Sequence, residues 1–312
     1  MTGRWERLGR LTPDTSAAPW AASHAALPMV EADGDGAWWL YLSLRDGEGR
    51  ARIGRCRLTL GNTPSAGAIE PDPCLALGEP GAFDDSGVFG SCLVHADGVT
   101  WLYYTGWIRR VTVPFQLASG LARRDGSGRF VRVSRAPILG RTDQEPFLNA
   151  SPFVRHEAGA WTMWYIGGQG WRMTETPPEP VYDIRVARSR DGIAWERHGE
   201  QPFPPAEGEH AFGRPWVLRD AEGFHLWFAV RGSRYRIGYA WSADGVAWRR
   251  DDARAGLGPG TDAWDDEMVE YPCVFDAGET RYMLYNGNGY GRTGVGIAVW
   301  RDAAGTPAGG RA

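Results

Sequence analysis

Acidic side chains stand shortly before apolar segments in three separate parts of the chain. The five residues that could perform acid–base chemistry are Asp84, Asp85, Glu145, Glu267 and Glu270. Carboxyl groups can share such work, because a nearby arginine keeps one group ionised while burial or a second acid keeps another protonated. This chemistry requires a fold that brings the separate segments to one place.

A second group of polar and aromatic residues lies near the ends of other apolar segments. It comprises His24, Arg45, Trp107, Asn149, Trp171, Arg214, Arg231, Asn286, Asn288 and Tyr290. Its arginines favour an anionic ligand, because the planar guanidinium matches phosphate or carboxylate. The two tryptophans and the tyrosine offer flat apolar faces. Structural roles stay open, since the aspartates can bind loop amides and the arginines can be buried partners of the later glutamates.

The chain repeats two short markers with one irregular period. The first is an aromatic run, and its five copies end at Ser43, Thr105, Ile166, Ala229 and Asn286. The central residues of the second marker are Pro28, Cys92, Pro152, Pro215 and Pro272. Copies of the first marker are 62, 61, 63 and 57 residues apart, and copies of the second are 64, 60, 63 and 57 apart. Two independent markers with matched spacing indicate five structural repeats.

Each repeat has the pattern of four antiparallel strands. The markers supply two, a third apolar run follows, and turns at Asp191-Gly192 and Asp244-Gly245 lead into an outer strand. Five such units predict an all-β fold, a five-bladed β-propeller with four-stranded antiparallel blades. The last repeat lacks its outer strand, and Trp5-Glu-Arg-Leu-Gly resembles Trp195-Glu-Arg-His-Gly of the third. We therefore expect the N-terminal strand to close blade five.

We expect one domain over residues 1–303 and a flexible tail at 304–312. The expected blades span about 21–62, 84–140, 145–203 and 208–252, with 264–302 plus 3–12 as the fifth. In a propeller, the starts of the inner strands and the ends of the second strands open on the same face of the hub. This geometry predicts that both groups of candidate residues meet in one central pocket.

Several segments carry a family resemblance: FDDSGVFGSCLV, WLYYTGW, RPWVLRD, YRIGYAWSADGVAW, and WDDEMVEYPCVF with RYMLYNGNGYGRTGVGIA. They span nearly the whole chain and resemble the five-bladed propeller superfamily of family 43, 32, 62 and 68 glycoside hydrolases. The resemblance is closer to a poorly characterised, glycosyl hydrolase-like branch.

The resemblance implies roles for some of the acids. In the characterised relatives an inner-strand Asp of blade one is the base or nucleophile, a blade-two Asp orients, and a blade-three Glu is the acid. Asp84 or Asp85 corresponds to the blade-two acid, and Glu145 to the blade-three acid. Blade one has His24 and no Asp in the expected place, while blade five brings two glutamates instead.

The implied function is a glycoside hydrolase-like enzyme that uses carboxylate acid–base chemistry on a small sugar or glycoconjugate, neutral or anionic. Three alternatives stay open. They are a non-hydrolytic biosynthetic enzyme (transferase, lyase or cyclase) that reuses the pocket, a phosphorylase, and a carbohydrate-binding propeller without catalysis. Fold alone does not choose among them.

The composition limits the classes of binding partner that we expect. The net charge is −4 and the basic residues are scattered, so no nucleic-acid footprint is visible. No apolar run approaches the roughly 18 residues of a membrane span. The N-terminus has no apolar segment after its arginines, so we expect no signal peptide and a cytoplasmic location. Four separated cysteines predict neither a zinc site nor a disulfide framework. We expect a small-molecule ligand, no nucleic-acid or membrane partner, no cofactor and no metal.

Overall fold

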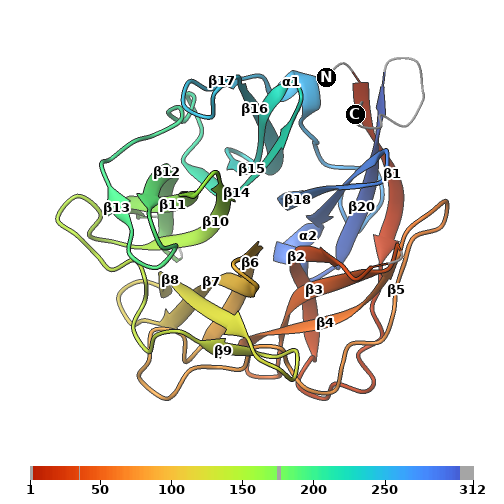
Figure 1. Cartoon of the computed structure of the whole chain (residues 1–312), viewed down its shortest axis with the longest axis horizontal. Helices are drawn as coiled ribbons and strands as arrows, with labels where there is room; N and C mark the ends of the chain where they lie inside the picture. Colours follow the sequence, from red (N-terminus) through yellow and green to blue (C-terminus); the bar gives the residue numbers. More distant parts are fainter. Residues whose placement is uncertain (1–2, 35, 174–176, 303–312) are drawn as a thin grey trace.

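A computed structural model describes residues 3–34, 36–173 and 177–302 of the chain (Figure 1). The tail expected at 304–312 lies outside these residues. Strands make up nearly all of the regular structure, and the two helices, α1 (Asp252–Ala255) and α2 (Asn288–Gly291), are single turns. Among the described residues, neither helix has the length and apolar character that crossing a membrane would require.

Strand pairing in the described residues gives one four-stranded sheet and two eight-stranded sheets, each of the latter being two antiparallel units of four strands joined by one parallel contact. The five units are arranged around a common centre (Figure 1). Unit one contains β2 (Ser23–Ala32), β3 (Trp38–Arg45), β4 (Ala51–Thr59) and β5 (Ser65–Ala66). Unit two contains β6 (Gly87–Ala96), β7 (Val99–Arg109), β8 (Phe115–Arg124) and β9 (Phe130–Arg132). Unit three contains β10 (Asn149–Glu157), β11 (Ala160–Arg172), β12 (Glu179–Ser189) and β13 (Glu196–Arg197).

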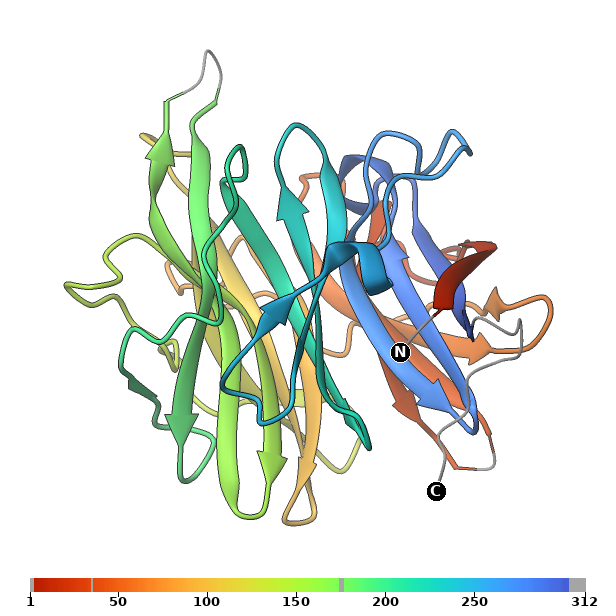
Figure 2. The ribbon, with the colours of Figure 1, turned by 90° about the horizontal axis from the view of Figure 1, so that it is seen from above.

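The remaining strands form the last two units. Unit four contains β14 (Ala211–Asp220), β15 (Gly223–Arg231), β16 (Tyr235–Ser242) and β17 (Arg249–Arg250). Unit five contains β18 (Glu270–Ala277), β19 (Thr280–Asn286), β20 (Val295–Asp302) and β1 (Gly3–Leu11). Seen from above in Figure 2, the long strands run between two ends at which the loops gather. The all-β propeller fold predicted from the repeats is confirmed.

The N-terminal strand completes the fifth unit. β1 pairs antiparallel with β20 from Gly3 opposite Asp302 to Leu11 opposite Val295. The Trp5 indole N–H donates to the Ala255 carbonyl at 2.9 Å. Burying this ring and pairing the edge of β20 joins the two ends of the chain, which closes the ring of units.

A β-bulge interrupts every innermost strand at the second repeated marker. The pairing register shifts beside Pro28, Cys92, Pro152, Pro215 and Pro272. In four units the residue just before the proline has a positive φ: Leu27 49°, Ser151 51°, Arg214 42° and Tyr271 56°. Proline suits a bulge, because its nitrogen donates no ladder hydrogen bond there. The marker repeats because the same backbone turn repeats.

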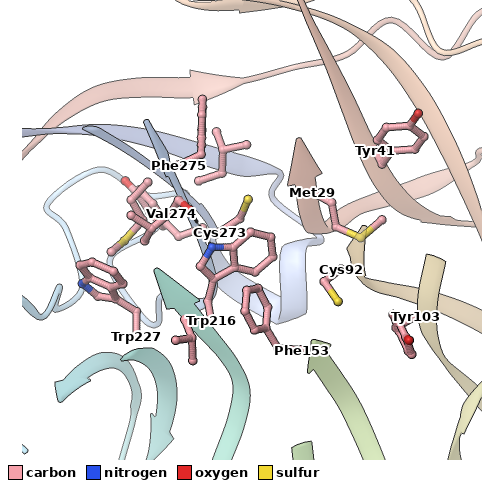
Figure 3. Close-up of a cluster of buried hydrophobic side chains, with 14 of the residues drawn as sticks. Met29, Tyr41, Cys92, Tyr103, Phe153, Trp216, Trp227, Cys273, Val274 and Phe275 are labelled. Carbon is pink, nitrogen blue, oxygen red and sulfur yellow. Dashed lines mark hydrogen bonds between the residues drawn. The ribbon is translucent and has the colours of Figure 1, made fainter. Parts of the chain in front are cut away.

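An apolar plug fills the hub beyond the bulges (Figure 3). Each innermost strand contributes one of its members, namely Met29, Cys92, Phe153, Trp216 and Cys273. All five are buried, and the Phe153 and Trp216 rings lie 4.8 Å apart. Because these side chains close the centre of the ring, the space above the bulges has a floor.

Replacing Trp5 with alanine tests the closure. Trp5 packs edge-on against Trp300 and Trp227, with ring centroids 5.1 and 6.2 Å apart. We expect Trp5→Ala to lower the free energy of unfolding by about 3–5 kcal/mol, because a large buried ring leaves a cavity. The neighbouring Glu6→Ala, which breaks only an exposed pair with Arg301, should cost less than about 1 kcal/mol. Denaturant titration measures both, and equal losses would contradict a closing role for β1.

Candidate functional site

A cavity of about 650 Å³ lies at the hub, and all five units contribute to its wall. The side chains that define it are Leu27, Arg45, Phe89, Trp107, Arg109, Arg110, Phe115, Ser151, Glu179, Tyr182, Arg231, Tyr235, Tyr271 and Tyr290, with small residues between them. The bulges form its floor, because the lining includes Leu27, Ser151 and Tyr271. These are three of the four residues that precede a marker proline and have a positive φ. A bulge can redirect a side chain out of the regular alternation of a strand, and here it directs side chains toward the cavity.

Trp107 and Phe89 form an aromatic platform on the unit-two wall. Their rings are stacked, with centroids 5.9 Å apart and planes 7° apart. Trp107 lies directly over Gly87, where an added Cβ would come within 1.6 Å of the indole nitrogen. Only glycine at position 87 therefore allows the ring to lie in this place. A flat apolar surface of this kind suits one face of a ring-shaped ligand.

Tyrosines cover the opposite wall, which units three to five provide. The Tyr182 and Tyr235 hydroxyls are hydrogen-bonded at 3.1 Å, and the Tyr290 ring meets Tyr235 edge-on at 6.0 Å. Arg231 lies over the Tyr235 ring at 5.4 Å, and its guanidinium forms an ion pair with Glu179. Burial raises the pKa of Tyr182 to about 12. This wall therefore presents neutral phenols and one carboxylate.

Glu270 is fully buried just beneath the cavity. In the other units, the residue two before the marker is Ala26, Gly90, Ala150 or Gly213, so a carboxyl group occurs there in unit five alone. Burial raises the pKa of Glu270 well above its usual range, although Asn286, Arg231, Tyr271 and Arg45 act in the opposite direction. Within the described residues, neither carboxyl oxygen makes a hydrogen bond of ordinary geometry. The protonated acid is therefore the favoured form.

Arg214 is buried in the hub at the bulge of unit four. Its guanidinium carbon lies 5.5 Å from the centroid of the Trp216 ring. One guanidinium nitrogen donates to the Pro28 carbonyl at 2.5 Å, while Nε and Nη1 have no acceptor among the described residues. Burial lowers its pKa to about 10. Arg214 thus lies below the cavity wall and links units four and one through the backbone of Pro28.

Two of the predicted catalytic acids, Asp84 and Glu145, are hydrogen-bonded inside the blades and do not line the cavity. Asp84 accepts hydrogen bonds from Tyr104 at 2.9 Å and Arg132 at 2.7 Å. Glu145 has the same surroundings, with the Tyr165 hydroxyl at 2.6 Å and the Arg197 guanidinium at 2.7 Å.

Unit five repeats this arrangement with Asp265, which accepts from Tyr285 at 3.1 Å and Arg7 at 2.9 Å. In each unit the acid precedes the inner strand, the tyrosine is on the second strand and the arginine is on the outer strand. We call these three groups the blade clamps.

The structure places the other two predicted acids outside the cavity wall. The Asp85 carboxylate accepts hydrogen bonds from the Gly81 amide and the Ser86 hydroxyl, so it organises its own loop. Glu267 is exposed, and its backbone amide donates to Asn288. Of the five predicted acids, only Glu270 lies next to the cavity, and the expected meeting of Asp85, Glu145 and Glu270 does not occur.

Four of the predicted ligand-binding residues are in the cavity wall, namely Arg45, Trp107, Arg231 and Tyr290. Trp171 lies one layer behind, edge-on to Phe115 at 5.5 Å. His24 is half-buried near Arg45, and burial together with the Arg45 and Arg292 cations lowers its pKa to about 4.

The three asparagines brace the backbone. Asn149 accepts from the Ser119 amide, and Asn288 accepts from the Glu267 and Met268 amides. Asn286 accepts from the Leu27 amide at 2.9 Å and so holds the bulge of unit one. These residues shape the site without facing the cavity.

Phe115, Glu179, Tyr182 and Tyr235 all line the cavity but were not among the predicted site residues. They lie at or near the starts of third strands β8, β12 and β16. A third strand runs in the same direction as the first, so its start opens on the same face. Extending the geometric rule to third strands would have found them. In the part of the chain that the structure describes, no group of three or more His, Cys, Asp and Glu side chains could hold a metal ion.

Comparison with known proteins assigns the chain to a family. No family model matches it. A Mycobacterium tuberculosis protein described as "Uncharacterized protein Rv1502" is 39% identical over 297 residues, which is 95% of this chain and 98% of the relative. This chain belongs to the Rv1502 family.

Solved structures share the fold of this Rv1502-family chain at low sequence identity. One titled "Glycoside hydrolase" has a TM-score of 0.74 and 18% identity, and the match covers 100% of this chain and 94% of the other. Another, from work on family 130 mannoside phosphorylases and glycoside hydrolases that target β-1,2-mannosidic linkages in Candida mannan, has a TM-score of 0.66 and 17% identity, over 100% and 97%. The suspected fold relationship to propeller glycoside hydrolases is confirmed.

Removing an arginine from a blade clamp tests its structural role. We expect Arg132→Met to lower the free energy of unfolding by about 3–5 kcal/mol, because it leaves the buried Asp84 carboxylate without its cation. Arg135→Met, three residues away, breaks only the exposed pair with Glu79 and should cost less than about 1 kcal/mol. Urea unfolding of both variants distinguishes them. A silent Arg132→Met would show that Asp84 is held by other contacts.

The pH dependence of stability tests the buried acid. Glu270 keeps its proton in the folded chain at pH values above its ordinary pKa of 4.5, where the unfolded chain has lost it. Each added pH unit therefore favours unfolding, by up to about 1.4 kcal/mol, until the folded-state pKa is reached. We expect this loss in the wild type but not in Glu270→Gln, measured by urea unfolding from pH 4.5 to 8. The exposed Glu267→Gln is the control, and parallel curves for all three proteins would refute a buried neutral acid.

Proposed function

We propose that this protein is a glycoside hydrolase-like enzyme that acts on a small sugar or glycoconjugate in the hub cavity. The observation that carries the proposal is the set of groups around one cavity. The Trp107–Phe89 platform and the carboxylate of Glu179 lie on facing walls, and the acid Glu270 is buried beneath the floor. The shared fold with glycoside hydrolases and with family 130 enzymes adds support by analogy, while the site residues carry the assignment.

The two carboxyl groups have the contrasting environments that glycoside chemistry uses. Cleavage needs a proton donor for the leaving oxygen and an ionised carboxylate that activates water or attacks carbon. Glu179 is ion-paired with Arg231 at the wall, whereas burial favours the protonated form of Glu270. Tyr271, next to Glu270 in the chain, lines the cavity. We assign the carboxylate role to Glu179. Glu270 is the proton source: it would pass its proton to the Tyr271 hydroxyl while that hydroxyl donates its own proton to the leaving oxygen.

Phosphorolysis is the second candidate, and a specific observation favours it. Arg45, Arg109 and Arg110 line the cavity, and none of them has a carboxylate partner within the described residues. A phosphorylase replaces water with phosphate, so it needs a bound anion and one acid. The cavity wall offers arginines for such an anion, and arginine binds phosphate through paired N–H donors.

Turnover of a panel of nitrophenyl glycosides, with and without inorganic phosphate, tests both candidates. We expect Glu179→Gln and Glu270→Gln to lower kcat by about 10²–10⁴-fold, because each removes a titratable proton while keeping the side-chain shape. Glu267→Gln, whose side chain is exposed and away from the cavity wall, should leave kcat unchanged. Activity that requires phosphate would select phosphorolysis.

Two results would count against the proposal. Wild-type turnover by both cavity variants would remove these carboxyl groups from the mechanism. Binding of sugars without turnover of any glycoside, with or without phosphate, would leave the cavity as a binding site only.

A further inference from the structure

Positive charge is unbalanced on one side of the cavity. Arg231, on the unit-four side, has Glu179 as a partner. Arg45, Arg109 and Arg110, on the sides of units one and two, form no ion pair with any acid in the described chain. The Arg109 guanidinium donates instead to the backbone carbonyl of Glu48. Three arginines thus contribute to this side of the cavity lining without an ion-paired carboxylate among the described residues.

The sheet holds these groups at the junction of units one and two. Arg45 is paired with Ala51, Ala51 with Gly87 and Gly87 with Trp107, in one row across four strands. Arg109 follows Trp107 by two residues on β7, so it lies on the same face of that strand. The backbones of Arg45, Arg109 and the aromatic platform therefore share one paired framework, and Arg110 directly follows β7.

Keeping these cations together is unfavourable in the free protein. Burial lowers the pKa of Arg45 and so does the nearby Arg109 cation, while Tyr271 and Glu270 act in the opposite direction. The half-buried His24 responds to the same field, with its pKa lowered to about 4 by burial and by Arg45 and Arg292. Arg45 is half-buried, whereas Arg109 and Arg110 are exposed. A half-buried cation without an ion-pair partner is destabilising, and an anion bound to Arg45 would relieve that cost. An anionic ligand would supply the negative charge that these arginines lack.

We propose that Arg45, Arg109 and Arg110 form an anion subsite for a phosphate or carboxylate group, beside the platform that receives a sugar ring. The anion is either a substituent of the sugar or a free inorganic phosphate, because both offer the same oxygens to a guanidinium. The sugar-binding part rests on the proposed function. The anion-binding part does not, because it can be measured without turnover.

Calorimetric binding at fixed low ionic strength tests the subsite. The probes are inorganic phosphate alone and three matched pairs, namely glucose with glucose 6-phosphate, mannose with mannose 6-phosphate, and galactose with galacturonate. We expect the anionic member of the best pair to bind at least about tenfold more tightly, which is the effect of a charged hydrogen-bonded pair. Arg45→Met should remove most of this preference, and Arg45→Lys should restore part of it.

Two controls separate the subsite from general effects. Arg123→Met removes a charge near the far end of β8, roughly 27 Å along the strand from Phe115, and should leave binding unchanged. The melting temperature of ligand-free Arg45→Met should not fall, because no ion pair is lost. Phosphate that binds together with a neutral sugar indicates a free anion, whereas phosphate that competes with the sugar phosphate indicates a substituent. Either pattern supports the subsite.

Three outcomes would overturn it. They are equal affinity for anionic and neutral sugars, an anion preference that survives Arg45→Met, and no binding of inorganic phosphate or any anionic sugar at millimolar concentration. The proposed function fails differently. A protein that binds anions through Arg45 but cleaves no glycoside defeats the enzymatic proposal and leaves the subsite in place.

Discussion

Where each innermost strand reaches the hub, its pairing with the second strand shifts beside the repeated marker residue. The cavity depends on this irregularity. A regular strand would alternate its side chains between the two faces of the blade, whereas the left-handed residues Leu27, Ser151 and Tyr271 form the floor of the cavity. Such backbone conformations cost about 1–3 kcal/mol each and persist when neighbouring contacts determine them. The buried plug and the hydrogen bond from Leu27 to Asn286 supply those contacts.

The buried acids near the starts of the inner strands occur in two environments, which differ in whether an arginine of the outer strand reaches the carboxyl group. In units two, three and five, an arginine from the outer strand reaches the acid in front of the inner strand and forms a blade clamp. These acids are buried, hydrogen-bonded and paired, which is how a charge is tolerated inside a protein. Glu270 lies on the inner strand itself, beyond the reach of such an arginine, and its favoured form is neutral.

The fold could be predicted from the sequence because its two markers each report a local property. The aromatic run reports a buried second strand, and the proline reports a bulge, so both repeat wherever the unit repeats. The site could be predicted only in part. Arg45, Trp107 and Arg231 follow from the geometry of strand ends, but Asp84 and Glu145 occupy equivalent positions and serve the blades instead. Their partners, Arg132 and Arg197, come from about 50 residues further along the chain, and no local pattern records which acid an arginine will reach.

A repeated scaffold and an asymmetric cavity are compatible because different positions perform the two tasks. The clamps, the plug and the bulged backbone recur around the ring and stabilise it. The bulge residues themselves differ in chemistry, from an apolar Leu27 through Ser91 and Ser151 to Arg214 and Tyr271. Buried polar atoms without partners, including those of Arg214 and Glu270, occur at this same level of the hub. Unpartnered buried atoms also occur within the blades, for example at Asp84 and Asp265. What distinguishes the hub is therefore that two ionisable groups, Arg214 and Glu270, depart there from the repeated pattern, and departures from local rules of stability are expected where a protein works.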